Sequence, residues 1–304
     1  MPEPRDDLRH PGEISGEHGR ESLFYNLLLP EHGVILFVYT WVDAEDRAGY
    51  LFTVVGEDDT RRCFFANDGV PVGDRDFDDW AVDGLTLRHR ELLHTADLAF
   101  SGEDVEFHAT FTAIHDAFSY RQNQDGCPPF IATDRFEQAG RMRGTLVLDG
   151  ERIEVDATTQ RDHSWGQRDW AAIQDWKWLS AQSSDAMALN VMLIHARGET
   201  TCHGYVARDG RAVSVVDVEI RARYDERWWQ TGLDATIVDE EGLETVVAGR
   251  RFAFLTFEAG GVATLNEAAC TGTIDGAAAL IHLECGWPTA YAHAQAQAAA
   301  ARSA

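Results

Sequence analysis

The chain has 304 residues, of which 44% are hydrophobic, and its 51 acidic and 26 basic side chains give a net charge of −25. This length suits one large domain or two domains of about 150 residues, each with its own core. The strong negative charge repels nucleic acid and anionic membrane surfaces, so we expect neither as a partner. The apolar runs are also too short for membrane insertion.

The cysteines and the N-terminal residues indicate the compartment. The five cysteines are widely spaced, odd in number and contain no CxxC pair, which favours a reducing environment over a disulfide framework or a cysteine metal site. The first twenty residues are charged and contain no apolar signal-peptide core. We therefore expect a cytoplasmic protein. The near-exclusive use of Arg over Lys, with abundant Ala, is typical of a high-GC bacterial genome.

Strand patterns dominate the chain. Residues 105–113 alternate apolar and polar side chains, the two-residue period of a strand with one buried face. Residues 144–157, 205–220 and 270–285 each contain two strand-like runs around a central Asp-Gly pair, which favours a tight hairpin turn. Only the alanine-rich tail, 290–304, has helical propensity, and without an apolar face it could equally be a frayed end.

Many short antiparallel strands predict an all-β fold of barrels or sandwiches. The division that we predict is an N-terminal arm (1–20), a first β-barrel (21–160), a seam (161–176), a second β-barrel (177–289) and an Ala-rich tail (290–304). The two halves open with similar aromatic-rich stretches, which suggests a repeated architecture. Because ligand sites favour domain interfaces, the seam is the first place to look for function. The oligomeric state is left open.

The seam begins with RDHSWGQRDW, residues 161–170, which concentrates charged, polar and indole side chains in ten positions. In a structural interpretation, Trp165 and Trp170 fill core space while the two Arg and the two Asp form a lattice of ion pairs. In a functional interpretation, burial against Trp raises the pKa of Asp162, which then serves as an acid or base. His163 would relay that proton, and the Trp165 face would stabilise a carbocation.

The motif and the residues before it resemble the signature of a bacterial superfamily. An (F/Y)EQ…G element, here Phe136-Glu137-Gln138 and Gly144, leads through a hairpin into DHSWG…RD. This pattern resembles the AttH-like and carotenoid 1,2-hydratase-like (hydroxyneurosporene synthase-like) proteins, and is most similar to uncharacterised bacterial members. The resemblance spans about residues 20–290 and implies two tandem lipocalin-like antiparallel β-barrels.

The resemblance also implies a chemistry. Family members of known role act on hydrophobic, polyunsaturated molecules, as alkene hydratases or as pericyclic or cyclising enzymes of natural-product (secondary) metabolism. In the carotenoid hydratases the His and Trp of an H-x-W core are implicated in function. These two residues correspond to His163 and Trp165. Those hydratases also use a Tyr and an Asp on the following strand, whereas residues 179–193 of this chain contain no Tyr and only Asp185 as an acid.

The sequence thus predicts a cofactor-independent acid–base enzyme, either a lyase (hydratase) or an isomerase or cyclase. Its partner would be a hydrophobic olefinic small molecule, isoprenoid or aromatic, that is hydrated, dehydrated, isomerised or cyclised. The predicted catalytic residues are Asp162, His163 and Trp165. The residues predicted to bind substrate or hold the cluster rigid are Glu137, Gln138, Arg161, Arg168, Asp169, Trp178 and Tyr25.

Two other interpretations remain open at this point. The chain could be a non-catalytic carrier of lipophilic molecules, because a fold alone does not establish catalysis, or the motif could be purely structural. We predict no metal site, since His94 would point away from His89 and Glu91 on a strand. His282 and Glu284 are expected to be strand residues with local partners.

Overall fold

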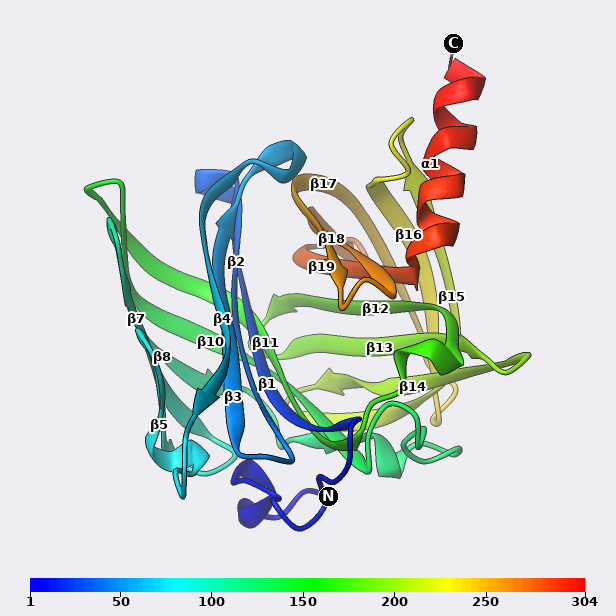
Figure 1. Cartoon of the computed structure of the whole chain (residues 1–304). Helices are drawn as coiled ribbons and strands as arrows, with labels where there is room; N and C mark the ends of the chain where they lie inside the picture. Colours follow the sequence, from blue (N-terminus) through cyan, green and yellow to red (C-terminus); the bar gives the residue numbers. More distant parts are fainter. Residues whose placement is uncertain (304) are drawn as a thin grey trace.

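The chain folds into two antiparallel β-sheets, as a computed structural model that describes residues 1–303 shows (Figure 1). The first sheet has eleven strands in the order β4-β3-β2-β1-β11-β10-β8-β7-β6-β5, with β9 paired to β10. The second sheet closes into a barrel in which β12 to β19 follow one another in chain order. The predicted all-β class with two lipocalin-like units is confirmed.

The first sheet consists of β1 (Gly19–Leu29), β2 (Val34–Asp43), β3 (Arg47–Val55), β4 (Arg61–Pro71), β5 (Trp80–Val82), β6 (Leu85–Glu91), β7 (Thr95–Gly102), β8 (Val105–Ala113), β9 (Phe118–Ser119), β10 (Asp134–Leu148) and β11 (Glu151–Gln167). The barrel consists of β12 (Ile173–Ser184), β13 (Met187–Ala196), β14 (Glu199–Arg208), β15 (Arg211–Tyr224), β16 (Gln230–Asp239), β17 (Glu244–Ala259), β18 (Ala263–Ile274) and β19 (Ala277–Pro288). The short 3-10 helices are η1 (Pro4–Asp7), η2 (Pro30–His32), η3 (Glu57–Asp59), η4 (Phe77–Asp79), η5 (Tyr120–Gln122) and η6 (Trp170–Ala172).

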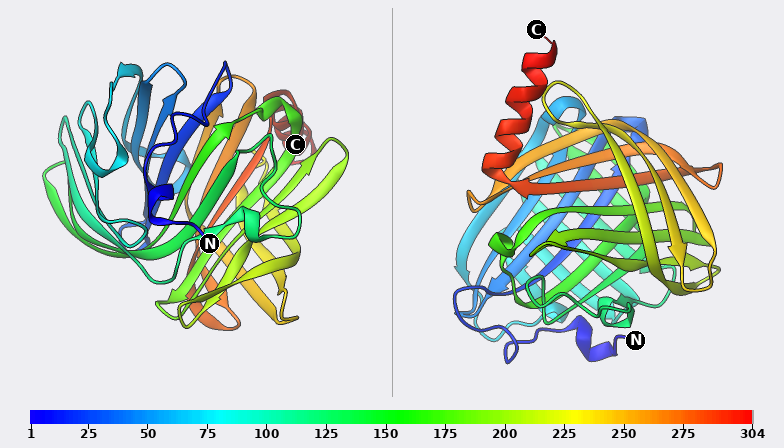
Figure 2. Two further views of the ribbon diagram at one scale, coloured as in Figure 1. Left: turned by 90° about the horizontal axis from the view of Figure 1, so that it is seen from below. Right: turned by 90° about the vertical axis from the view of Figure 1, so that its right-hand side faces the viewer.

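The first sheet curves around its own core (Figure 2). Side chains connect its two edges. Asn67 on β4 donates a hydrogen bond to Asp83, in the turn after β5, at 2.8 Å. Near the same two edges, the rings of Phe65 and Phe100 lie 5.1 Å apart. Among the described residues β4 and β5 share no backbone ladder, so the first unit approaches a barrel without completing one.

All three predicted Asp-Gly hairpins are confirmed. Asp149, Asp209 and Asp275 have φ angles of 54°, 50° and 49°, and the glycines after them have φ angles of 78°, 81° and 82°. A two-residue type I′ turn needs this left-handed conformation at both positions. The C-terminal tail forms helix α1 (Thr289–Ser303). None of the described helices is long and apolar enough to cross a membrane.

Most of the decapeptide belongs to the first sheet and only its last three residues lie in the connection between the two units, which corrects the bounds of the predicted seam. Residues 161–167 form the end of β11, a central strand that pairs with both β1 and β10. The chain leaves the first sheet only after Gln167 and enters the barrel at Ile173. These residues were predicted to form a seam between two barrels, but a strand that is covered on both faces can carry many polar residues when each face supplies partners.

The outer face of the first sheet packs against the barrel. Ile35 and Phe37 of β2 belong to one apolar cluster with Ala253 and Leu255 of β17. Residues 1–18 lie at the lower end of the first sheet, where the N-terminus is drawn in dark blue (Figure 1), and bury Asp7 and several neighbouring polar side chains. Two covered environments therefore meet at β11: the core of the first sheet and the interface with the barrel.

Candidate active site

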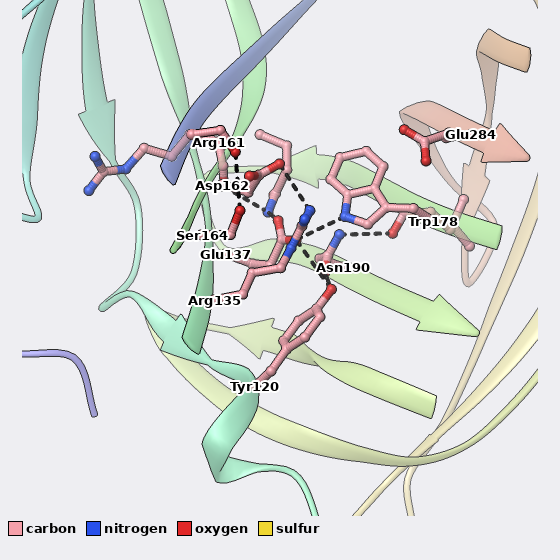
Figure 3. A network of polar contacts seen from close by, with 12 residues as sticks. Tyr120, Arg135, Glu137, Arg161, Asp162, Ser164, Trp178, Asn190 and Glu284 are labelled. Carbon is pink, nitrogen blue, oxygen red and sulfur yellow. Dashed lines mark hydrogen bonds and ion pairs between the residues drawn. The ribbon is translucent and has the colours of Figure 1, made fainter. Parts of the chain in front are cut away.

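The two faces of β11 carry different halves of the motif. Successive side chains of a strand point to opposite faces, so Arg161, His163 and Trp165 face the core of the first sheet. Asp162 and Ser164 instead face the barrel, and the Arg161 guanidinium points away from their cluster (Figure 3). The predicted partnership of Asp162 with His163 is therefore wrong, because the sheet itself separates the two side chains.

Glu137 is the centre of the barrel-facing cluster. Its side chain is fully buried and comes from β10, directly opposite Asp162 in the ladder. The carboxylate accepts hydrogen bonds from Arg135 Nε at 2.8 Å, Trp178 Nε1 at 2.9 Å, Gln160 Nε2 at 2.9 Å and the Tyr120 hydroxyl at 3.2 Å. Because Trp178 lies on β12, this carboxylate connects the first sheet to the barrel (Figure 3).

Asp162 is an acid of this cluster with a raised pKa. Burial raises its pKa to about 7, against the opposing effect of Arg135 and with a further contribution from the Glu137 charge. Arg135 Nη2 donates to Asp162 Oδ2 at 2.9 Å. The Asp162 side chain keeps 8% exposure, so it is not sealed from solvent. Asp162 can therefore give or take a proton near neutral pH.

The ion-pair lattice of the structural interpretation does not form. Arg168 donates from Nη2 to Ser164 Oγ and from Nη1 to the Tyr39 hydroxyl at 3.3 Å, so its contacts are hydroxyl groups. Asp169 accepts from the backbone N–H of Ala171 at 3.1 Å and caps η6. Asp169 was predicted to bind substrate, but a short polar residue before a helix is used here to satisfy a backbone donor.

The barrel adds two more acids to the interface. Glu267 on β18 and Glu284 on β19 are directly opposite in their ladder, and Glu284 is in turn opposite Trp178. Burial raises the pKa of each carboxyl to about 8, and for Glu284 the neighbouring Glu267 charge adds to the rise. Trp176 Nε1 donates to Glu284 Oε1. Each acid is therefore largely protonated at neutral pH.

His282 connects these acids to the first sheet. Its Nδ1 lies 2.9 Å from Asn26 Nδ2, and its Nε2 lies 2.8 Å from Glu267 Oε2. The Asn26 amide nitrogen can only donate, so His282 Nδ1 accepts and Nε2–H donates to Glu267. Burial lowers the pKa of His282 to about 4, which agrees with a neutral ring. The predicted local partners of His282 are thus incomplete, because Asn26 belongs to the other sheet.

We expect stability to fall as pH rises from 6 to 9. Asp162, Glu267 and Glu284 hold protons in the folded state up to pKa values of about 7, 8 and 8, whereas in the unfolded chain ordinary carboxyls lose them near pH 4. Between the unfolded and the folded pKa values, the folded state still binds protons that the unfolded chain has released, so stability falls with rising pH up to about pH 8 and then levels off. Urea unfolding at pH 6 and 9 measures the effect.

The matched variant for this pH effect is the double substitution Glu267→Gln, Glu284→Gln, which keeps hydrogen-bonding shape without ionisation. Its loss of unfolding free energy between pH 6 and 9 should be clearly smaller than that of the wild type. Glu244→Gln, at an exposed position, should behave as the wild type does. Equal losses in the double variant and the wild type would contradict the assigned pKa shifts.

His163 belongs to a second buried set, with Glu21 and His10. His163 Nε2 and His10 Nδ1 each lie 2.8 Å from Glu21 Oε1. Burial opposes ionisation of Glu21, but hydrogen bonds from the two rings lower its pKa to about 2. Among the described residues these three side chains have a spacing that could hold a metal ion, with their ligand atoms within 4.8 Å of one another. Both N···O distances are ordinary hydrogen-bond lengths, so the three side chains form a hydrogen-bonded bridge, while His10 Nε2 and His163 Nδ1 make no hydrogen bond within the described residues.

Trp165 shares this environment. Its ring stacks on His10 with centroids 3.8 Å apart, and its Nε1 donates to Glu13 Oε2 at 3.0 Å. The following Gly166 has φ +122°, and a Cβ there would lie 2.3 Å from the backbone nitrogen of Thr133. Trp165 and Gly166 therefore hold the N-terminal segment and the loop that contains Thr133 against the end of β11.

Three further predicted residues face the same core. Arg161 Nη1 donates to Asp7 Oδ1 at 2.8 Å, and Arg161 Nε donates to Gln138 Oε1 at 2.9 Å. The Tyr25 hydroxyl accepts from Arg161 Nη1 at 3.4 Å. Of the ten predicted site residues, the structure brings together Asp162, Glu137, Trp178 and Arg168 at the interface. It places Arg161, His163, Trp165, Gln138 and Tyr25 inside the first sheet.

Sequence reasoning missed several interface residues. Arg135 and Gln160 could have been found by stepping two positions along each strand from Glu137 and Asp162. Glu267 and Glu284 carried a weaker signal, as charged residues within otherwise apolar strand runs. No pattern in the sequence indicated Tyr120, Asn190 or Asn26. Asp185, the only acid in 179–193, lies outside the cluster and contacts Arg141 at 3.7 Å in an exposed turn.

A family model described as "Domain of unknown function (DUF7064)" matches residues 3–289. The chain belongs to the DUF7064 family. No curated protein sequence matches this DUF7064 member. Solved structures are similar to it over most of its length, which confirms the predicted resemblance to the AttH-like group.

Three of these structures illustrate the likeness. A protein of Nitrosomonas europaea assigned as AttH has a TM-score of 0.67 at 14% identity, covering 94% of this DUF7064 chain and 96% of its own. Kievitone hydratase of Nectria haematococca has a TM-score of 0.60 at 11% identity, with 92% of each chain covered. CghA with Sch210972 has a TM-score of 0.62 at 13% identity, covering 89% and 88%. At these identities the likeness establishes the fold.

Proposed function

We propose that this DUF7064 protein is an acid–base enzyme that protonates a carbon–carbon double bond of a hydrophobic small molecule, with Asp162 as the acid. The observation that carries the proposal is the position of Asp162. It is a buried carboxyl with a pKa raised to about 7, it pairs with Arg135 at 2.9 Å, and it lies where two β-units meet. Perturbed acids at such interfaces are the usual sign of proton-transfer sites.

In this proposal each neighbour of Asp162 has a role. Protonated Asp162 adds its proton to one alkene carbon and becomes a carboxylate, while the other carbon becomes cationic. Glu137 and the Trp178 ring stabilise that cation, by charge and by the π face respectively. Loss of a neighbouring proton back to Asp162 completes an isomerisation. Addition of water followed by the same proton return completes a hydration, and attack by a second double bond begins a cyclisation.

One feature favours hydration or its reverse among these reactions. A recess of about 10 Å³ lies between the sheets, with Asn26, Gln160 and Gln182 in its wall, and has room for one water molecule. The buried Gln182 amide makes no hydrogen bond within the described chain, so it offers a water both a donor and an acceptor. Gln160 connects this recess to Glu137. The hydratase among the similar structures supports the same choice.

The proposal is tested with a lipid-soluble extract of the producing organism in deuterated water. Wild-type protein and Asp162→Asn are incubated separately with the extract, and the products are compared by mass spectrometry. A compound that gains deuterium or the mass of water only with the wild type supports proton-transfer catalysis and identifies the substrate. Compounds that both proteins retain without any mass change would instead identify a carrier of lipophilic molecules.

A further inference from the structure

A second recess lies next to the acid cluster, beyond Tyr120. It measures about 540 Å³, within the range of small-molecule sites in proteins. One wall is the loop after η5 and the other is the hairpin of β13 and β14. The residues that line it are Asp125, Pro128, Pro129, Phe130, Ala196, Glu199, Thr200, Thr201 and His203.

His203 is the polar group of this recess that lacks a full set of partners. Its side chain is fully buried, and its Nε2 lies 3.0 Å from Thr201 Oγ1. Its Nδ1 makes no hydrogen bond within the described chain. Burial lowers the pKa of His203 to about 4, so the ring is neutral at physiological pH. A buried ring nitrogen without a partner costs free energy, which a bound ligand can recover.

The chemistry of the wall narrows the ligand class. In a neutral imidazole one nitrogen donates and the other accepts. If Nε2 donates to Thr201, Nδ1 accepts, and if Nε2 accepts from Thr201, Nδ1 donates. A ligand hydroxyl group can hydrogen-bond to Nδ1 in both cases. Pro128, Phe130 and Ala196 supply apolar surface. Asp125 and Glu199 are exposed acids that line the recess, whereas Arg197 is outside its lining, with its guanidinium 5.5 Å from the Phe130 ring centroid. The lining residues therefore carry a net negative charge, which disfavours anionic groups.

We propose that this recess binds a neutral, largely apolar small molecule through a hydroxyl group that hydrogen-bonds to His203 Nδ1. The site adjoins the acid cluster through a single residue, because Tyr120 stacks on His203 with centroids 5.4 Å apart and hydrogen-bonds to Glu137. The proposal stands independently of catalysis at Asp162, since it concerns binding alone.

Calorimetric titration of the full chain with three matched probes tests the site. 4-Propylphenol carries the hydroxyl, propylbenzene lacks it and 4-propylbenzoate replaces it by an anion. We expect saturable binding of 4-propylphenol, about tenfold weaker binding of propylbenzene, as for the loss of one hydrogen bond, and no binding of 4-propylbenzoate. Absence of saturable 4-propylphenol binding, or equal binding of all three probes, would overturn the proposal.

Two variants locate the binding. His203→Phe keeps an aromatic ring against Tyr120 but removes the nitrogen, so 4-propylphenol should bind about tenfold more weakly while propylbenzene is unaffected. Thr201→Trp fills the recess from the same face of β14 as His203 and should abolish binding of both, even if His203→Phe fails to fold. Thr86→Trp, an exposed threonine on β6, should bind as the wild type does. Undiminished binding in Thr201→Trp would place the ligand elsewhere.

Discussion

Replacing Asp162 by asparagine is expected to lower kcat by about a hundredfold or more, because general acids contribute on that scale. Asparagine preserves the shape of the side chain and can still accept a hydrogen bond from Arg135, but it has no proton to give. Wild-type turnover should also fall as pH rises through 7, where the acid form of Asp162, with its pKa raised to about 7, is lost. Steady-state kinetics between pH 5.5 and 9, on the substrate identified from the extract, measures both effects.

The control for this experiment is Asp156→Asn, which lies on the same strand but is half exposed and pairs with Arg141 and Arg143. Its kcat should match the wild type. Unchanged turnover in Asp162→Asn would remove Asp162 from the mechanism. A wild-type rate that stays constant across pH 7 would argue against Asp162 as the proton donor even if the variant were inactive.

His163→Ala is expected to lower the free energy of unfolding by about 3 kcal/mol. The substitution leaves a cavity among buried rings and removes one of the two imidazoles that hydrogen-bond to the buried Glu21 carboxylate. The motif alone suggested the opposite outcome, in which His163→Ala abolishes turnover without changing the melting temperature. The structure reverses that expectation because His163 faces the core of the first sheet. Urea unfolding at pH 7 measures the difference.

The matched control here is His94→Ala, at a histidine whose side chain is 54% exposed and contacts only nearby residues. Its unfolding free energy should stay within about 0.5 kcal/mol of the wild type. If His163→Ala were as stable as the wild type but inactive, the earlier assignment of His163 to the catalytic machinery would have to be restored. A loss of stability with normal residual turnover per folded molecule would assign it to structure.

Local features of the chain were predictable because they depend on neighbouring residues alone. The Asp-Gly turns require left-handed φ angles that few other pairs accept, so the three hairpins follow from the sequence. The alternation along 105–113 likewise follows from the pleat of a strand and was realised in β8. The family resemblance joined Glu137 and the DHSWG motif through a hairpin, and they do lie opposite each other on the paired strands β10 and β11.

The faces and partners of the residues in the 161–170 motif could not be predicted from neighbouring residues alone. Asp162 and His163 were predicted to share a proton relay because they are neighbours in the sequence, but neighbouring side chains of a strand face opposite ways. Whether a polar residue can be buried in a strand depends on the partner that tertiary packing brings to it. Here Glu21 and the N-terminal segment supply partners on one face, and Arg135 supplies one on the other.

The sequence by itself determined the all-β class, the hairpin positions and the residues around which a polar cluster would form. Only the tertiary structure decided which of those residues meet. Asn26 on β1 and the two acids Glu267 and Glu284 on β18 and β19 lie far from Asp162 along the chain. They reach the same interface because the first sheet packs its outer face on the barrel. The raised pKa values of these acids arise mainly from burial between the two units. Burial is a property of the packed interface, so no local stretch of sequence contains it.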